Sequence, residues 1–326
     1  MARERLYGGR SLTYWGHFFD MGLFLNINIY TDKVQVANGR NLFLPRYQPQ
    51  VRIQDQRPRV IKTLDEVFSL ERSKKVKKQE ELLHHSRWYS ADPAKCWDFL
   101  YGIESHMRIR RVMVRSFIDF LEDKLAYRQK YGEDAAARRD LSQLKREAEL
   151  AQAFFIQKNT PFTALYVPTP ESLAGILDTY GSMRIKLIPP SKQLKFQSRV
   201  EIETVHTGLL EGLTVAYQGT QVNPKSRNKQ GQIIYTWEAA GTKSRRVLEE
   251  VVDWLLFRKE ICAAVLDFQD HQERVKKSFR GMPRSQVIDP AEVERRNAER
   301  WKLYADWINT KIKAGEYSRN RHISIF

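Results

Sequence analysis

The sequence predicts an α+β protein made of two pseudo-symmetric α-β-β-α-β-α-α repeats, joined by a helical connector and followed by a C-terminal helix. Three observations support this prediction. The same succession of patterns occurs twice, each occurrence contains the period-2 alternation of half-buried strands, and 42% of the 326 residues are hydrophobic, enough to fill folded cores. The repeats are expected at 11–125 and 170–275, the connector at 126–169, and the C-terminal helix and tail at 276–326.

Each repeat opens with a short helix that leads into an alternating strand. The first reads "LTYWGHFFDMGLFLNINIY" and the second "PESLAGILDTYGSMRIKLI". When Asp20 is aligned with Asp178, the apolar positions of the two strands fall in the same phase, so each strand has one apolar and one polar face. The matched apolar residues are Leu25, Ile27 and Ile29 in the first copy and Met183, Ile185 and Leu187 in the second.

The remaining elements follow in the same order in both copies. A second strand, "QPQVRIQ" or "QSRVEIE", precedes a helix, "VIKTLDEVF" or "LLEGLTVAY". Basic insertions at 72–78 and 225–229 then lead to short strands that hold Tyr89 and Trp237. Two helices are expected to close each copy, and they end at matching Asp-Phe pairs, Asp119-Phe120 and Asp267-Phe268.

Two helical segments lie outside the aligned repeats. The connector contains the charged helical stretch "LSQLKREAELAQAFF". Asp289 followed by Pro290 is typical of a helix start, and that helix is expected to end before Gly315. Its aromatic and basic residues suit either docking into a larger assembly or packing on its own domain.

Composition and charge restrict the function. Lys and Arg exceed Asp and Glu by 55 to 39, which gives a net charge of +16 and favours a polyanionic partner. The charge is spread over the whole chain, which favours nucleic acid over a membrane surface, and no apolar run is long enough to span a bilayer. Cys96 and Cys262 lie in apolar helical stretches and are expected to be core residues rather than a disulfide or zinc ligands. No cofactor is predicted.

The stretch "LAGILDTYGS" at 173–182, together with the repeat, resembles the LAGLIDADG homing endonucleases in their two-repeat single-chain form. This resemblance implies a monomeric pseudo-dimer in which two signature helices pack side by side at a pseudo-two-fold axis. Gly16, Ala174 and Gly175 are then the small residues that allow close packing of these helices. It also implies two twisted antiparallel sheets that form a saddle along a nucleic-acid duplex.

The resemblance also locates the positions where active members hold divalent metals, namely the second acid of each signature. Here those positions carry Gly22 and Tyr180. Glycine has no side chain, and a phenol is a poor ligand for a hard cation that prefers carboxylate oxygens. We therefore expect no catalytic residue, no bound metal and no nuclease activity. Asp20 and Asp178 match the earlier acid of the signature and are expected to form structural hydrogen bonds near the helix ends.

The polar strand faces and the basic insertions make up the predicted nucleic-acid-binding surface. Amides and arginines on these faces can bind phosphates and base edges, and lysines at the rims can reach the backbone. Glu201 and Glu203 on the same face count against tight tracking of regular B-form DNA. The predicted binding residues are Asn26, Asn28, Gln50, Arg52, Lys74, Lys75, Arg184, Lys186, Arg199, Lys225, Arg227 and Lys229.

Three functions follow from these features. The first is a non-catalytic protein that clamps structured RNA, as an rRNA-stabilising component of a mitochondrial or chloroplast ribosome with neighbouring ribonucleoprotein subunits as partners. A group I intron splicing factor, or maturase, is the alternative within the same class. The others are a site-specific DNA endonuclease and a DNA-binding protein. The spread of basic residues over helices, connector and C-terminal extension favours RNA, and the loss of both acids favours the ribosomal role.

Overall fold

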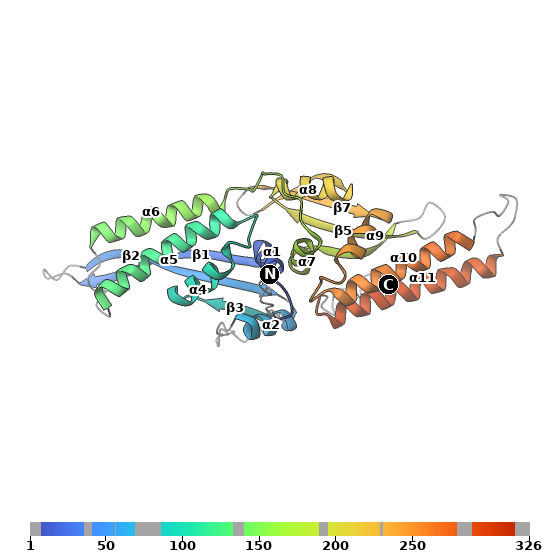
Figure 1. The fold of residues 1–326 in the computed structure, drawn as a ribbon, viewed down its shortest axis with the longest axis horizontal. Coiled ribbons are helices and arrows are strands. Elements are labelled where there is room, and N and C mark those ends of the chain that lie inside the picture. The colour runs from blue at the N-terminus through green and yellow to red at the C-terminus, as the bar shows by residue number, and fades with distance from the viewer. Residues whose placement is uncertain are drawn as a thin grey trace, which may run out of the picture. The chain divides into compact units, whose positions relative to one another are not determined.

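The computed structural model describes residues 8–35, 41–55, 57–68, 86–132, 140–188, 195–228, 231–278 and 289–316. The chain forms two compact units of nearly equal length, 1–161 and 162–326. Figure 1 shows the elements of each unit. None of the helices in these ranges combines the length and the apolar character that a membrane crossing requires.

The first unit contains a three-stranded antiparallel sheet in the order β1-β2-β3. Its long hairpin pairs Leu23 with Ile53 at one end and Gln35 with Asn41 at the other. In chain order the elements are α1 (Leu12–Gly22), β1 (Leu23–Gln35), β2 (Asn41–Asp55), α2 (Pro58–Phe68), β3 (Ser86–Ser90), α4 (Pro93–Glu104), α5 (Arg111–Tyr131) and α6 (Leu141–Lys158).

The second unit contains a four-stranded antiparallel sheet in the order β4-β5-β7-β6. In chain order its elements are α7 (Pro170–Thr179), β4 (Ser182–Ile188), β5 (Lys195–Thr204), α8 (Thr207–Tyr217), β6 (Thr220–Arg227), β7 (Ile233–Ala240), α9 (Thr242–Val251), α10 (Lys259–Ser278) and α11 (Pro290–Lys313).

Strand β6 is a departure from the predicted order, because part of the expected insertion at 225–229 belongs to this edge strand. The pairing of β6 with β7 shifts register between Val222 and Ser226. Pro224 lies within this irregularity, where its missing N–H is tolerated at a sheet edge. The irregularity removes the alternation by which a strand is recognised in sequence.

The predicted alternation is confirmed in the first part of β1 and in β4, but Ile29, one of the matched apolar residues, is 59% exposed. Leu23, Leu25 and Ile27 are buried on one face of β1, and Met183 and Ile185 on the matching face of β4. The strand register also gives the equivalent tryptophans of the two sheets. Trp88 pairs with Ile53 and Trp237 pairs with Ile202, and both indoles are fully buried. Trp88, rather than Tyr89, is therefore the counterpart of Trp237.

Each unit ends in a pair of adjacent helices, and this makes the structural repeat one helix longer than the repeat in the sequence. Helix α6 packs on α5 and β2, and α11 packs on α10 (Figure 1). The connector helix of the first unit is thus equivalent to the C-terminal helix of the second. The sequence alignment missed this because the two helices share no recognisable motif.

Helix α11 packs on its own unit, one of the two roles that its aromatic and basic residues suit. The rings of Trp301 and Tyr304 lie 5.3 and 5.5 Å from the ring of Phe196 in β5, and Trp307 is buried. Its aromatic residues therefore complete the core of the second unit. Of the expected tail at 316–326, all residues but Glu316 lie outside the described residues.

Both cores are dense in large side chains, and both cysteines belong to them, as predicted. Helix α1 buries Tyr14, Trp15, Phe18 and Phe19, whose rings form edge-to-face and stacked contacts. Burial raises the pKa of the Cys96 thiol to about 11 and that of Cys262 to about 12. Both thiols are therefore neutral and unreactive at physiological pH.

Candidate nucleic-acid interface and the ends of the signature helices

The two signature helices, α1 and α7, are bounded by local sequence signals. Ser11 caps the start of α1 by accepting the N–H of Tyr14, and Thr169 caps α7 by accepting the N–H of Ser172. Helix α7 also has Pro170 at its first position, where no N–H is needed. Each helix leads within a few residues into the first strand of its sheet.

Asp20 and Asp178 make the same contact in their two units. Each carboxylate is fully buried and accepts the backbone N–H groups of the three residues that immediately precede α5 or α10. The donors to Asp20 are Arg108, Ile109 and Arg110, at 2.8, 3.1 and 2.8 Å. The donors to Asp178 are Leu256, Phe257 and Arg258, at 2.6, 3.2 and 2.8 Å.

These contacts confirm the predicted structural role of the two acids. These N–H groups precede the first helical turn and have no partner within the helix, and the helix dipole favours negative charge near its N-terminus. Burial raises the pKa of Asp20, while His17 and the three N–H donors oppose the shift. The carboxylates therefore serve to join each signature helix to the helix that follows the sheet.

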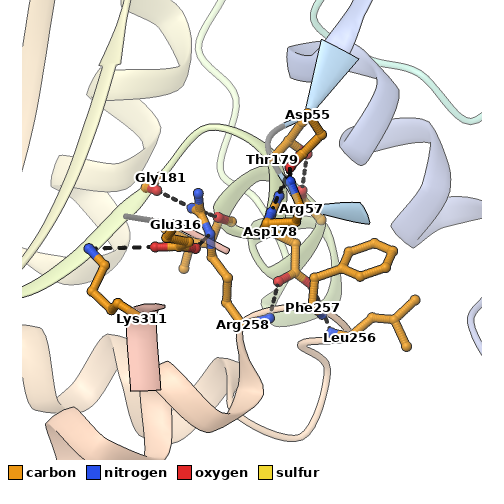
Figure 2. A network of polar contacts seen from close by, with 12 residues as sticks. Asp55, Arg57, Asp178, Thr179, Gly181, Leu256, Phe257, Arg258, Lys311 and Glu316 are labelled. Atoms are coloured by element: carbon orange, nitrogen blue, oxygen red, sulfur yellow. Dashed lines mark hydrogen bonds and ion pairs between the residues drawn. The ribbon is translucent and has the colours of Figure 1, made fainter. Parts of the chain in front are cut away.

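An arginine on each of these segments adds a second connection to the signature helix. The guanidinium of Arg110 donates to the carbonyl of Leu23 at 2.5 Å. The guanidinium of Arg258 donates to the carbonyls of Leu177 and Gly181 (Figure 2). These carbonyls lie in the last turn of α7 or just beyond the ends of α1 and α7, where the helix supplies no donor, and the arginines hydrogen-bond to them.

The positions matching the metal-binding acids of the resembled family provide no suitable ligands. Gly22 is the last residue of α1 and offers no side chain, and Tyr180 caps the end of α7. Tyr180 is 51% exposed, and partial burial together with the Glu203 carboxylate raises the pKa of its phenol. The phenol is therefore neutral, and a hard divalent cation prefers charged oxygen ligands. Within the described ranges, no three His, Cys, Asp or Glu side chains gather in a way that could hold a metal ion.

Gly16 has a contact in its own unit that explains why the residue is small. A Cβ built on Gly16 would lie 2.3 Å from the carbonyl oxygen of His106 and 2.5 Å from its carbon. The backbone of α1 therefore touches the segment between α4 and α5, which also carries the donors to Asp20. Ala174 and Gly175 are buried in α7. Their predicted packing against the other signature helix stays a prediction.

On the polar face of the first sheet, predicted binding residues from β1 and β2 lie together. The pairing places Asn26 opposite Gln50 and Phe24 opposite Arg52. Asn26 donates to Asn28 at 2.7 Å, and the Arg52 guanidinium lies 4.2 Å from the centre of the Phe24 ring. These side chains are half-buried or exposed, so this face is accessible to a ligand.

On the polar face of the second sheet, the predicted arginines are paired with glutamates. Arg184 forms an ion pair with Glu201, and Arg199 forms one with Glu238 at 2.6 Å. Arg184 and Arg199 lie opposite each other in the strand pairing, and each binds a carboxylate from a neighbouring strand. Lys186 is exposed on the same sheet. The electrostatic attraction of this face for phosphate is therefore lower than its arginines alone suggest.

The remaining predicted binding residues lie on β6 or outside the described residues. Arg227 is exposed at the end of β6, and Lys225 belongs to the same strand. Lys74, Lys75 and Lys229 lie outside the described residues. Sequence reasoning did not identify Lys158, which ends α6 and donates to Asn26 at 2.9 Å. No sequence signal could have found Lys158, because 132 residues separate it from Asn26 and only packing brings the two together.

The fold described above has clear counterparts among solved structures. I-SmaMI bound to uncleaved DNA in the presence of calcium ions has a TM-score of 0.65 and 10% identity, over 90% of this chain and 98% of that one. The LAGLIDADG homing endonuclease I-GzeII in complex with its DNA target has a TM-score of 0.64 and 10% identity, over 90% and 97%. I-LtrWI bound to target DNA has a TM-score of 0.63 and 10% identity, over 90% and 96%.

These similarities define the class of fold. The chain has the two-repeat single-chain fold of the LAGLIDADG homing endonucleases, as the sequence predicted. No protein-family model matches the chain, and no curated protein matches it either.

Proposed function

We propose that this chain is a nucleic-acid-binding protein that has lost the chemistry of the endonucleases it resembles. One observation carries the proposal: each unit keeps the buried aspartate that joins its helices, Asp20 or Asp178, while Gly22 and Tyr180 occupy the metal positions. The chain therefore keeps the buried hydrogen bonds of the fold but lacks the carboxylates that would bind metal ions for cleavage. The net charge of +16 supports retention of a polyanionic partner.

We infer that the partner is structured RNA, and specifically rRNA in a mitochondrial or chloroplast ribosome with neighbouring proteins around it. Glu203 is exposed and Glu238 is half-buried on strands of the second sheet, where a regular duplex backbone would meet them. Carboxylates in these positions oppose continuous phosphate tracking and favour an irregular ligand. A group I intron RNA has the same chemistry and is the alternative ligand of this class.

DNA binding without cleavage is the second candidate, because solved structures with this fold are bound to DNA. Purification of the tagged chain from its native cells after ultraviolet cross-linking distinguishes these ligands. We expect sequencing of the bound nucleic acid to recover rRNA, and sedimentation to place the chain with a ribosomal subunit. Recovery of one intron RNA would instead assign the splicing role, and recovery of DNA alone would contradict RNA binding.

The loss of cleavage is tested directly with purified protein. A supercoiled plasmid library with randomised inserts should remain uncut and unnicked in magnesium or manganese, because neither Gly22 nor Tyr180 supplies a carboxylate. Tyr180→Asp alone should also leave the library intact, since Gly22 still lacks a ligand. I-SmaMI, known in a complex with cleaved DNA, serves as the positive control on its own target. Metal-dependent cleavage that persists through purification would refute the proposal.

A further inference from the structure

The two units differ in charge at equivalent positions, and the difference centres on a lysine near the end of each unit's last helix. Lys158 is the last residue of α6, and Lys311 lies in the last turn of α11. The positive charges of Arg110 and Arg258, the equivalent arginines at the starts of α5 and α10, act on these two lysines respectively. Lys158 and Lys311 are therefore structural counterparts.

In the first unit, Lys158 reaches the polar face of the sheet. Its ammonium donates to Asn26 at 2.9 Å and lies 4.8 Å from the centre of the Phe24 ring. The Arg52 guanidinium lies 4.2 Å from the centre of the same ring, so two cations share one aromatic side chain. No carboxylate in the described part of the chain forms an ion pair with Lys158.

In the second unit, glutamate carboxylates form ion pairs with the cations at the equivalent positions. Glu201 takes the position that Arg52 has in the first sheet, and it pairs with Arg184. Glu316 forms ion pairs with both Arg258 and Lys311, and its Oε2 lies 3.5 Å from the Lys311 ammonium (Figure 2). The cations of this unit are therefore largely neutralised by their own chain.

The charge on Lys158 is destabilised by its surroundings. Burial lowers its pKa to about 8, with further contributions from Arg110 and Arg52. Those two arginines, from the start of α5 and from β2, are the charged groups that act on it. An anion bound beside Lys158 would favour the ammonium and relieve the repulsion among the three cations. Burial also lowers the pKa of Lys311, but there Glu316 already opposes the shift.

We propose that Lys158 and Arg52 together bind one backbone phosphate of the nucleic-acid ligand, with Asn26 positioning the lysine, and that the equivalent surface of the second unit binds none. This inference rests on the proposed nucleic-acid-binding function. The ammonium supplies a point charge and the guanidinium a fork of N–H donors, a combination suited to a phosphodiester. Binding at the sheets is thus asymmetric in a pseudo-symmetric fold.

Fluorescence anisotropy with a labelled RNA hairpin and a DNA hairpin of the same sequence tests this inference. Lys158→Met keeps the apolar stem over the aromatic rings and removes the charge. It should weaken binding several-fold and lower the slope of log affinity against log salt by about 0.7–0.9, the loss of one phosphate contact. Lys311→Met is the matched control and should leave the slope unchanged. Thermal unfolding of each variant verifies that the fold is retained.

The pH dependence provides an independent readout. Below pH 8 the free protein carries a charged Lys158, whereas above pH 8 this lysine must take up a proton to bind phosphate. Affinity should therefore fall between pH 8 and 9.5, by at most about ten-fold per pH unit. Lys158→Arg should bind at pH 7 like the natural protein and lose this decline, because an arginine stays charged.

The possible outcomes separate the two proposals. If Lys158→Met matches the natural protein in salt slope and pH dependence, the phosphate site is refuted while nucleic-acid binding stands. If the natural protein binds neither hairpin, both proposals fail. Equal losses in Lys158→Met and Lys311→Met would refute the asymmetry.

Discussion

Replacement of Asp178 by alanine is expected to lower the free energy of unfolding of the second unit by about 3–5 kcal/mol. The carboxylate is fully buried and accepts the N–H groups of Leu256, Phe257 and Arg258. Alanine would leave these three buried donors, in the residues just before α10, without a partner. Asp178→Asn keeps one acceptor oxygen and should lose less.

Urea denaturation measures the loss, and hydrogen exchange of the peptides around 256–258 assigns it to the second unit. Asp253→Ala is the matched control, because Asp253 precedes the same helix but its side chain is 86% exposed. Its replacement should change the free energy of unfolding by no more than about 0.5 kcal/mol. Equal effects of the two substitutions would show that the buried carboxylate does not join the helices.

Replacement of Gly16 by alanine is expected to lower the free energy of unfolding of the first unit by about 3 kcal/mol or more, at the upper end of overpacking costs. The new Cβ would lie 2.3 Å from the carbonyl oxygen of His106. Because this neighbour is backbone, no change of rotamer can relieve the clash. The segment that must move also carries the N–H donors to Asp20, so those hydrogen bonds should weaken together with the helix contact.

Gly102→Ala provides the control for Gly16→Ala. Gly102 lies inside α4, and no atom lies within 4 Å of a Cβ built there. Alanine should therefore stabilise the first unit by about 0.5–1 kcal/mol through its higher helix propensity. Thermal denaturation and hydrogen exchange at 106–110 compare the two variants. A Gly16→Ala protein as stable as the natural one would show that the close backbone approach is not required.

Much of the fold could be predicted because its signals are local or repeated. The alternation around Asn26 and Arg184 identifies two strands and their buried faces, since side chains alternate across a sheet. The recurrence of an aspartate ahead of each strand, at Asp20 and Asp178, relates the two copies. Strand β6 was not predicted because an irregularity near Pro224 interrupts its alternation. The equivalence of α6 and α11 was not predicted because two helices can occupy equivalent positions in a fold without sharing a sequence motif.

The predicted interface was only partly determined by the sequence. Residue types on the strand faces identified cations that could bind phosphate, such as Arg52 and Arg184. Which of them has a carboxylate beside it depends on neighbours within a few ångströms, and those neighbours come from distant parts of the chain. Glu201 reaches Arg184 through strand pairing, and Lys158 reaches Asn26 across 132 residues.

The sequence by itself therefore determined the repeat, the phase of the strands and the residues at the positions that match the metal-binding acids of the resembled family, because each depends on order along the chain. Only the tertiary structure decided how charge is distributed over the two faces. Long basic side chains can reach several partners, and the energy of a charge depends on burial and on the charges nearest to it in space. Lys158 and Lys311 lie in the last turns of equivalent helices, and the carboxylate of Glu316 beside only one of them distinguishes the two units.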